Sequence, residues 1–222
     1  MKPFILLLAL TSAAMAERIS LFDGKTLDGW EVRPGEEKWW KVQDGLITGG
    51  SLDEQVPHNT FLASKKRYAN FDLRLKVRLV KGEGFMNSGI QIRSIRVPGD
   101  SEMSGYQVDA GPGWWGKLYD ESRRNKVIGE PVDPAALKAH DWAWNDYRIL
   151  CEGPRIRTWI NGVAALDYTE ADGKIPLEGL IGVQAHSGGK VLAQFKDITI
   201  EELPATPGAP VWEKAEVPVP AR

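Results

Sequence analysis

Apolar and polar residues alternate along several short stretches of the chain, most regularly in FDLRLKVRLV, residues 71–80. In this stretch every second side chain from Phe71 to Leu79 is apolar, and the side chains between them are charged. Successive side chains of a β-strand point to opposite faces, so a period of two predicts a strand with one buried face. DYRILCE, IGVQAH and VLAQFKDITIEEL indicate further strands.

Two dipeptides predict tight turns between strands. Asp44-Gly45 separates WWKVQ from LITGG, and Asn161-Gly162 separates RIRTWI from VAALDY. Asp-Gly and Asn-Gly tolerate the left-handed backbone that a two-residue type I′ hairpin requires. Convincing helical periodicity is absent, and only PAALKAH, residues 134–140, fits a short turn of helix.

These strands and turns predict an all-β fold, an antiparallel two-sheet β-sandwich or jelly roll. The chain has no internal repeat of about 20–50 residues, which disfavours a propeller or a solenoid. After Leu203 the sequence contains prolines that prevent ladder hydrogen bonding. We therefore expect a sandwich domain over residues 17–203 and an extended Pro-rich tail over residues 204–222, packed through Trp212.

The first 16 residues, MKPFILLLALTSAAMA, indicate a secretory signal peptide. Lys2 supplies the positive charge, residues 4–10 the apolar segment and Ala14-Met15-Ala16 the cleavage site. The apolar run is too short to span a bilayer. We expect an exported, periplasmic or extracellular protein that is not inserted in a membrane after the signal is cleaved.

Charge and cysteine content narrow the function classes further. The 222-residue chain has 28 Lys and Arg against 30 Asp and Glu, and it has no block of one charge. Nucleic acid and anionic membrane surfaces are therefore poor candidate partners. The single cysteine, Cys151, permits no internal disulfide, and its strand-like context indicates a buried, inert thiol. Nine tryptophans are a high number, and exposed Trp rings are common in carbohydrate-binding proteins.

Three strand-like stretches, NSGIQIRS, GYQVDA and IGVQAHS, carry unusual polar faces. Their polar positions hold amide, guanidinium, carboxyl and imidazole groups, which suit fixed hydroxyls and carbonyls better than they suit solvent. If the strands are neighbours, these positions form a polar floor on one concave face. The polar floor comprises Gln91, Arg93, Gln107, Asp109, Gln184 and His186.

The stretch that follows the second of these strands is expected to form the rim of the floor. It contributes Trp114, Trp115, Tyr119, Glu121, Arg123 and Arg124. The alternative is that each strand simply faces solvent. The chain has no zinc, EF-hand, P-loop, dinucleotide or G-x-S-x-G motif. A divalent metal held by Asp109, Glu121 and His186 across strands stays open, because sequence spacing does not test it.

Several segments occur in an order that resembles a known family. They are LFDGKTLDGW, FMNSGIQIR, GYQVDAG followed by LYDESRRN, WNDYRILCEGPRIRTWINGV and GLIGVQAHSGGKVLAQFKDITIEEL. Together they resemble the 3-keto-disaccharide hydrolase family over residues 19–203. The resemblance implies a concanavalin A-like jelly roll in an exported bacterial protein that cleaves glycosides oxidised at C3. The family pattern Gly-Tyr-Glu-x-Gln is changed here, because Gln107 replaces the acid and an acid appears at Asp109.

The 3-keto group that the resemblance implies makes cleavage easier than ordinary glycoside hydrolysis. The ketone acidifies the C2 proton, so a base removes it and the enolate expels the C1 substituent, after which water adds. We expect Asp109, His186 or Glu121 as base or acid, with Asp109 and His186 ranked first. Arg93, or a bound metal, would stabilise the enolate oxygen.

The remaining floor and rim residues are assigned to sugar binding. Trp114 and Trp115 would stack on the sugar, and the other groups would bind hydroxyls. Those groups are Gln91, Gln107, Tyr119, Arg123, Arg124 and Gln184. A non-catalytic, lectin-like carbohydrate-binding module would use the same features, and an interaction domain with the Pro-rich tail as its docking segment is a third class. The sequence does not separate these alternatives, nor does it give the linkage or the oligomeric state.

Overall fold

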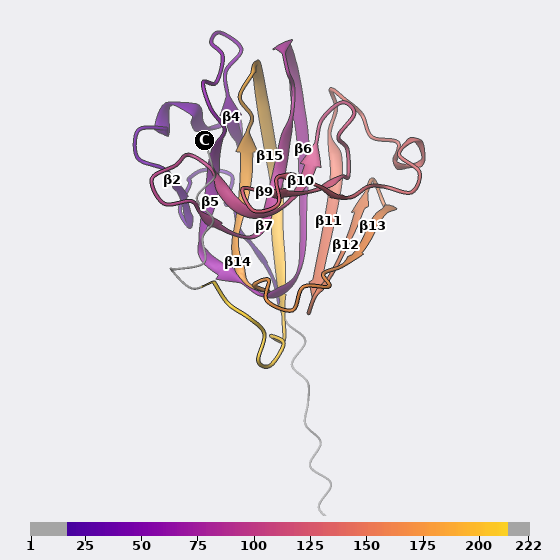
Figure 1. Ribbon diagram of the computed structural model, residues 1–222. Helices are drawn as coiled ribbons and strands as arrows, with labels where there is room; N and C mark the ends of the chain where they lie inside the picture. The colour runs from indigo at the N-terminus through magenta and orange to yellow at the C-terminus, as the bar shows by residue number, and fades with distance from the viewer. Residues whose placement is uncertain (1–16, 213–222) are drawn as a thin grey trace, which may run out of the picture.

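The computed structural model describes residues 17–212, so the expected signal peptide and the end of the tail, residues 213–222, lie outside it. Two antiparallel sheets stack face to face (Figure 1). In order, the eight-stranded sheet contains β13 (Val163–Thr169), β12 (Arg155–Ile160), β11 (Asn145–Glu152), β6 (Asn70–Gly84), β15 (Gly189–Leu203), β4 (Leu46–Gly50) and β3 (Trp40–Gln43), with β1 (Arg18–Ser20) also pairing with β15. The seven-stranded sheet contains β10 (Lys126–Gly129), β9 (Leu118–Glu121), β8 (Met103–Ala110), β7 (Ser88–Arg96), β14 (Gly179–Ala185), β5 (Thr60–Tyr68) and β2 (Trp30–Val32).

The predicted two-sheet sandwich is therefore confirmed, and so are its two tight hairpins. β3 and β4 are joined by Asp44 and Gly45, with φ of 54° and 74°. β12 and β13 are joined by Asn161 and Gly162, with φ of 51° and 79°. Both pairs have the positive φ values of a type I′ turn. The only helical turns within residues 17–212 are 3-10 turns, at Glu37–Trp39 and Ala135–Leu137.

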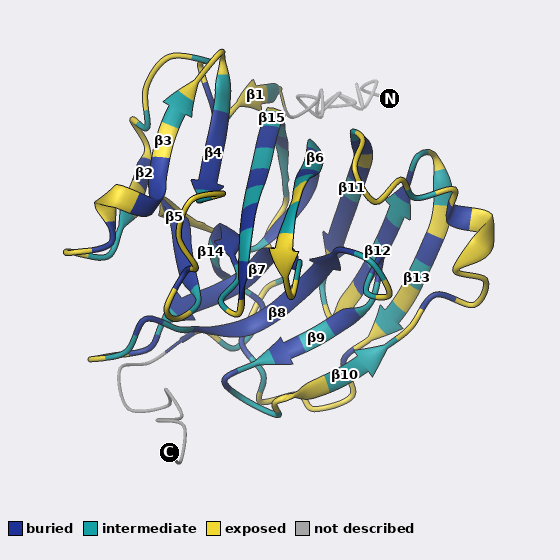
Figure 2. Ribbon diagram, turned by 90° about the horizontal axis from the view of Figure 1, so that it is seen from above, coloured by how far each residue is buried: buried dark blue, intermediate teal, exposed yellow. Residues whose placement is uncertain are grey.

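The core lies between the sheets and is built by alternation. In β6 the apolar side chains from Phe71 to Leu79 are all buried, while Arg74 on the opposite face is exposed. Figure 2 shows this arrangement from above, with the buried residues concentrated in the central strands and the exposed ones in loops and edge strands. Cys151 is fully buried, and burial raises the pKa of its thiol to about 11, as expected for an inert thiol.

The outer face of the seven-stranded sheet is also partly covered. Phe61, Ala63 and Met103 form a second small apolar cluster there, separate from the core between the sheets. Gln184 is paired with Phe61, and its neighbours Val183 and Ala185 belong to the main core. Gln184 and its register partners therefore face away from the core, on the side where the polar floor was expected.

The described part of the tail folds back onto the sandwich. Asn70 donates a hydrogen bond to the carbonyl of Pro204, and the carbonyl of Pro210 accepts one from the backbone of Leu177. Trp212 is buried and its Nε1 donates to the carbonyl of Arg93 at 3.0 Å. Residues 204–212 thus cover one end of the sandwich. Within residues 17–212 the structure contains no helix with the length and apolarity of a membrane span.

Candidate active site

A pocket of about 220 Å³ lies on the outer face of the seven-stranded sheet, at the end where several loops meet. Strands β8 and β9 supply its floor, and the loops that precede β5, β7, β9 and β15 supply its walls. Its lining residues are Asn59, Phe85, Asn87, Gln107, Asp109, Trp114, Tyr119, Glu121 and His186. A larger hollow on the eight-stranded sheet is lined by surface ion pairs such as Lys76–Asp146, and it lacks such a group of buried acids.

Gln107 and Asp109 stand on the same face of β8, two residues apart. A directed chain of hydrogen bonds reaches them from β7. Ser94 Oγ donates to Gln91 Oε1 at 2.6 Å, and Gln91 Nε2 donates to Gln107 Oε1 at 2.9 Å. Gln107 Nε2 then donates to Asp109 Oδ1 at 2.8 Å. The chain fixes one oxygen of Asp109, while Oδ2 is buried and has no protein partner in the described residues.

The absence of a side chain at Gly89 makes room for this chain. A Cβ on Gly89 would lie 2.5 Å from Cγ of Gln107, closer than van der Waals contact permits. Gly89 is the register partner of Asp109, in the strand that also carries Gln91. The glycine of the NSGIQIR stretch therefore lets the Gln107 amide lie flat across β7 and reach the carboxylate.

The two carboxyl groups of the pocket have pKa values close to neutrality. Burial raises the pKa of Asp109 to about 7. Burial, and then the negative charge of Asp109, raises the pKa of Glu121 to about 7. A buried carboxyl group loses hydration when it ionises, and two neighbouring carboxylates repel each other. Both carboxyl groups therefore take up and release protons near pH 7.

Glu121 and Tyr119 reach the pocket from β9 because this strand pairs with β8. Tyr119 is opposite Gln107, and Glu121 is opposite Gly105, so both share the face of Asp109. The alternate residues of β9 point the other way, and Leu118 is part of the core. Burial raises the pKa of Tyr119, so its phenol is a neutral hydrogen-bond donor at the edge of the pocket.

His186 follows β14 and enters the pocket from the β14–β15 turn. Its Nδ1 lies 2.6 Å from the carbonyl oxygen of Ser187. A carbonyl oxygen only accepts hydrogen bonds, so Nδ1 carries the proton and Nε2 carries a lone pair. Burial lowers the pKa of His186, which favours the neutral imidazole. The Phe85 ring meets the imidazole edge-on, with 4.8 Å between ring centroids.

The two adjacent tryptophans have different roles. Trp114 lines the pocket, is half-buried, and meets Phe85 edge-on with 6.4 Å between ring centroids. Trp115 is buried in the core, and its Nε1 donates to Asp141 Oδ1 at 2.8 Å. Trp114 is therefore placed to contact a ligand in this pocket, whereas the expectation that Trp115 stacks on a ligand there is wrong.

Arg93 does not belong to the polar floor, because a β-bulge between Ile92 and Ile95 interrupts the alternation of β7. The backbone of Arg93 has a φ of 50°, which re-aims its side chain. The guanidinium is fully buried at the end of the sandwich and donates to the carbonyls of Ala69 and Gly153 and to Asn70 Oδ1. Its predicted role in stabilising an enolate is therefore wrong.

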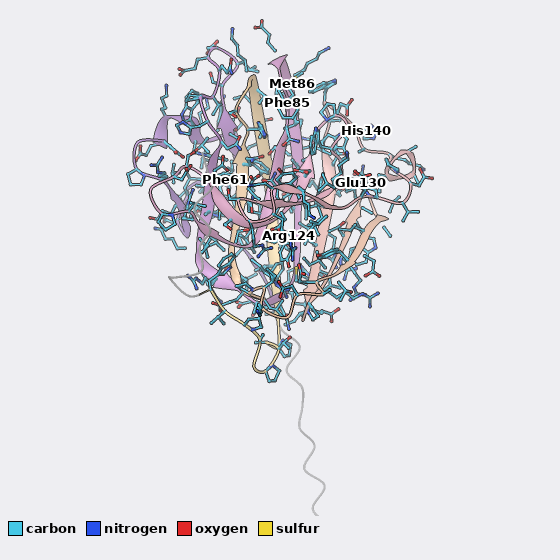
Figure 3. The ribbon with its side chains drawn as sticks, viewed as in Figure 1. Phe61, Phe85, Met86, Arg124, Glu130 and His140 are labelled. Atoms are coloured by element: carbon cyan, nitrogen blue, oxygen red, sulfur yellow. The ribbon has the colours of Figure 1, made fainter. Side chains whose placement is uncertain are left out.

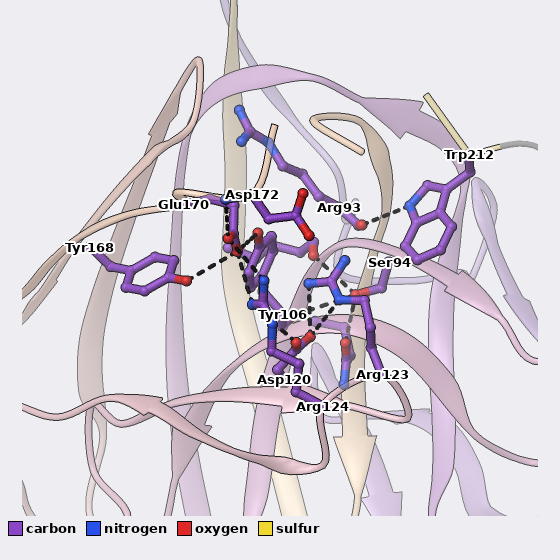
Figure 4. Close-up of polar contacts among 12 residues, drawn as sticks. Arg93, Ser94, Tyr106, Asp120, Arg123, Arg124, Tyr168, Glu170, Asp172 and Trp212 are labelled. Carbon is purple, nitrogen blue, oxygen red and sulfur yellow. Dashed lines mark hydrogen bonds and ion pairs between the residues drawn. The ribbon is translucent and has the colours of Figure 1, made fainter. Parts of the chain in front are cut away.

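Arg123 and Arg124 also lie away from the pocket. Both pair with Asp120, which faces the core side of β9, and Arg124 forms a two-pronged pair with Glu170 (Figure 4). The guanidinium of Arg123 also lies over the Tyr106 ring. Figure 3 places Arg124 at a different level of the sandwich from Phe85. These arginines close an end of the core, and the prediction that they border the ligand site is wrong.

The remaining two floor residues, Gln91 and Gln184, do not reach the pocket. Gln91 supports Gln107 by the hydrogen bond described above and is fully buried. Gln184 is also fully buried, and neither amide atom has a hydrogen-bond partner among residues 17–212. Neither glutamine lines the pocket. Their predicted contact with sugar hydroxyls does not follow from this geometry.

Three lining residues, Asn59, Phe85 and Asn87, were not predicted from the sequence. All three lie in connections that precede strands, where alternation gives no signal. Phe85 and Asn87 do lie in FMNSGIQIR, one of the segments that carry the family resemblance, and this was the one signal that could have identified them as site residues. Within residues 17–212 no three His, Cys, Asp or Glu side chains are grouped so that they could hold a metal ion. The metal site left open for Asp109, Glu121 and His186 is therefore not formed by these residues.

The two-sheet sandwich defines a concanavalin A-like fold, and the outer face of its seven-stranded sheet carries an acidic pocket. Residues 17–201 match the 3-keto-alpha-glucoside-1,2-lyase-like domain. The chain belongs to this family, as its resemblance to the 3-keto-disaccharide hydrolases implied. No curated protein matches the chain in sequence.

Solved structures with the same fold include candidate glycosyl hydrolases and a carbohydrate-binding module. A candidate glycosyl hydrolase of Parabacteroides distasonis superposes with a TM-score of 0.64 at 20% identity, covering 84% of this chain and 94% of that one. The carbohydrate-binding module CBM66 of Bacillus subtilis has a TM-score of 0.58 at 17% identity, covering 78% and 96%. A galectin-like protein of Bacillus subtilis has a TM-score of 0.62 at 10% identity, covering 87% and 98%. At these identities the likeness establishes the fold alone, and it confirms the lectin-like jelly roll.

Proposed function

We propose that the protein cleaves 3-keto-glycosides by removing the C2 proton and eliminating the C1 substituent. The family described above supports the substrate class. The observation that carries the chemistry is that one small pocket brings together His186, Asp109 and Glu121. Their pKa shifts leave a neutral imidazole beside carboxyl groups that hold a proton near pH 7. An elimination needs this combination of base and acid.

In the proposed first step, Nε2 of His186 takes the C2 proton. The electron pair of the C2–H bond forms the C2=C3 bond, and the C3 carbonyl oxygen becomes the enolate oxygen. The hydrogen-bond donors proposed to stabilise the enolate oxygen are the Asn87 amide and the neutral Tyr119 phenol, both of which line the pocket. They replace Arg93 in the role of enolate stabiliser.

In the proposed second step, the enolate collapses and the C3 carbonyl forms again. The C2=C3 electrons become the C1=C2 bond, and the C1–O bond breaks. The leaving oxygen keeps the electrons of that bond and takes a proton from the Asp109–Glu121 pair. Addition of water to the resulting enone, at C1, then gives the free 3-keto sugar, so that elimination and hydration together amount to hydrolysis.

Incubation of purified protein with 3-keto-glucosides tests this proposal. Asp109→Asn removes the acid with little change of shape, and His186→Ala removes the base. Each variant is expected to lose about 10²–10⁴ in rate. Asp141→Asn is the matched control, because it makes the same change at the Trp115 hydrogen bond, outside the pocket. Unchanged turnover in both pocket variants, with every substrate tested, would refute the mechanism.

A non-catalytic carbohydrate-binding module is the second candidate function. Half-buried Trp114 beside a polar pocket suits sugar binding without catalysis, and CBM66 shares the fold. A binding module has no need for buried carboxyl groups of raised pKa, and therefore the lyase is preferred. If the wild-type protein binds sugars in calorimetry but turns over none of the 3-keto-glucosides, the binding module replaces the enzyme.

We also propose that the protein acts outside the cytoplasm. Its support is the MKPFILLLALTSAAMA sequence, which has the charge, apolar segment and small-residue site of a secretory signal. Mass spectrometry of the protein recovered from its native host tests this idea. A mature chain that begins near Glu17 is expected, and a chain that retains Met1 and stays in the cytoplasmic fraction would contradict it.

A further inference from the structure

The turn that carries His186 is held from two sides. On one side, Asn59 Oδ1 accepts hydrogen bonds from the backbone N–H of Ser187 at 3.0 Å and from its Oγ at 3.2 Å. On the other side, the carbonyl of Gly188 accepts from the backbone N–H of Phe85 at 3.1 Å. Asn59 comes from the loop before β5, so a residue distant in sequence fixes the β14–β15 turn.

The orientation of the Asn59 amide follows from these contacts. Its oxygen faces two donors of Ser187, so its nitrogen must face an acceptor. That acceptor is Oε1 of Glu102, which lies 3.1 Å from Asn59 Nδ2. Burial, and then the charge of Glu121, raises the pKa of Glu102 to about 8, so this carboxyl is neutral at pH 7 and adds no charge beside the pocket.

The position of the Ser187 backbone sets the chemistry of the imidazole. The Ser187 carbonyl accepts the proton of His186 Nδ1, and this leaves Nε2 as the basic nitrogen. If the Ser187 carbonyl turned away, Nδ1 would lose its acceptor and both neutral tautomers would be populated. Ser187 is kept in place by the hydrogen bonds that its backbone N–H and its Oγ donate to Asn59.

We propose that Asn59 is a positioning residue, which holds the Ser187 turn between Glu102 and the pocket so that His186 presents Nε2 as the proton acceptor. The kinetic part of this inference rests on the proposed function. The structural part, the tautomer of His186, does not depend on any activity. Asn59 also lines the pocket, but its side-chain oxygen and nitrogen are already engaged by Ser187 and Glu102.

Nitrogen-15 NMR of the imidazole rings tests the structural part, because the chain has only three histidines. Wild-type His186 is expected to show separate Nδ1–H and unprotonated Nε2 signals. In Asn59→Ala the two shifts are expected to converge as the tautomers mix. Asn59→Asp keeps an oxygen that accepts from Ser187, so His186 in this variant should show the same two separate nitrogen signals as in the wild type. Identical His186 shifts in wild type and Asn59→Ala would overturn the inference.

Ser64→Ala is the matched control, because Ser64 joins the same two strands, β5 and β14, within the sheet. Its Oγ accepts from the backbone N–H of Ile181 at 3.0 Å, as Asn59 accepts from Ser187. Ser64→Ala should lower the unfolding temperature and leave the His186 tautomer unchanged. If Asn59→Ala does not fold, Ser187→Ala removes one of the two hydrogen bonds to Asn59. It should shift the tautomer in the same direction by a smaller amount, and no shift would overturn the inference.

Kinetics with a 3-keto-glucoside test the functional part. Asn59→Ala is expected to lower kcat by about 10²-fold, because a misplaced base loses its alignment with the reacting atom. KM should change little, and Asn59→Asp should recover most of the rate. If wild type turns over no 3-keto-glucoside, the proposed function fails while the NMR comparison still decides the role of Asn59. If wild type is active and Asn59→Ala has the same kcat, Asn59 has no positioning role.

Discussion

Gln107 Nε2 donates a hydrogen bond to Asp109 Oδ1 across 2.8 Å, and both side chains lie on the same face of β8. The family pattern that this chain resembles has the acid first and the amide second, in Gly-Tyr-Glu-x-Gln. Here the order is reversed, but an amide and a carboxyl group still stand two residues apart on one face. The departure therefore moves the carboxyl group from the first position of the pair to the second, and the pairing of a carboxyl group with an amide is kept.

Replacing Gln107 by Glu is expected to raise the pH at which activity is lost on the alkaline side. The hydrogen bond from Gln107 lowers the pKa of Asp109, and the substitution removes it and adds a like charge. The measurement is the pH profile of kcat/KM with a 3-keto-glucoside. Gln194→Glu, on the outer face of the eight-stranded sheet, is the control and should leave the profile unchanged. An unmoved alkaline limb in Gln107→Glu would show that Asp109 is not the acid.

If the proposed function holds, the wild-type protein is expected to have a bell-shaped pH profile. His186 must be neutral to accept a proton, and burial places its pKa below the ordinary value of 6.5, so activity falls only in acid. The carboxyl pair must hold a proton, and its pKa values of about 7 make activity fall as the pH rises above neutrality. A profile of kcat/KM measured between pH 4 and 9 checks both limbs. Activity that keeps rising to pH 9 would contradict the assignment of a carboxylic acid.

Asp109→Asn is expected to stabilise the protein at alkaline pH. The carboxyl has an ordinary pKa of 3.8 and a folded value of about 7, so the unfolded chain ionises first. Folding stability of the wild type therefore falls as the pH rises from about 4 to about 7, and the loss is complete above pH 7. Each unit of such a shift corresponds to about 1.4 kcal/mol, so the gain in the variant is on the order of a few kcal/mol.

Urea unfolding at pH 5 and pH 8 measures this effect. The difference between Asp109→Asn and wild type should be larger at pH 8 than at pH 5. Asp141→Asn makes the same substitution at an exposed position outside the pocket and is the control. Equal stability of Asp109→Asn and wild type at pH 8 would mean that the Asp109 carboxylate is not destabilised by burial.

The sequence was sufficient to predict the sandwich because its signals are local. Asp44-Gly45 and Asn161-Gly162 determine their hairpins through backbone conformations that few other residues adopt. The alternation from Phe71 to Leu79 needs only a regular strand, and β6 is regular there. By contrast, Asn59, Ser187 and His186 meet through strand order and loop packing, which no local pattern records.

Trp114→Ala is expected to weaken sugar binding and leave the fold intact. Trp114 is half-buried at the pocket, and loss of a stacked ring there should raise KM about tenfold, equivalent to about 1.4 kcal/mol. Trp115→Ala is the matched comparison, because this ring is buried in the core and its removal should destabilise by about 3–5 kcal/mol. Kinetics and urea unfolding of both variants separate the two effects. A large loss of stability in Trp114→Ala with an unchanged KM would reverse the assignment.

The candidate site was predicted less completely than the fold. The alternation of side chains along a strand correctly placed Gln107 and Asp109 on one face, because β8 has no bulge between them. The same alternation predicted the wrong face for Arg93, because the bulge in β7 reverses the side on which this residue lies. Trp114 and Trp115 could not be distinguished, since they follow a turn in which side-chain direction depends on the tertiary contacts of each ring.

Arg93→Lys is expected to destabilise the protein and to leave catalysis unchanged. The Arg93 guanidinium donates to three acceptors, the carbonyls of Ala69 and Gly153 and the Oδ1 of Asn70. A lysine ammonium does not reproduce this planar, forked set of donors, so buried acceptors are left without partners. The expected loss is about 2–3 kcal/mol, since an unpaired buried polar group costs about 1–3 kcal/mol.

Urea unfolding and kcat, measured on the same preparation of Arg93→Lys, separate a structural role of Arg93 from a catalytic one. A structural Arg93 predicts a lower urea midpoint with wild-type kcat for the folded fraction, because its guanidinium lies at the end of the sandwich beside the Trp212 contact and away from the pocket. Trp212→Phe removes the indole donor to the Arg93 carbonyl and should act in the same direction with a smaller effect. Wild-type stability with a loss of kcat in Arg93→Lys would instead indicate that Arg93 acts in catalysis. Arg93 would then replace Tyr119 and Asn87 as the proposed stabiliser of the enolate oxygen.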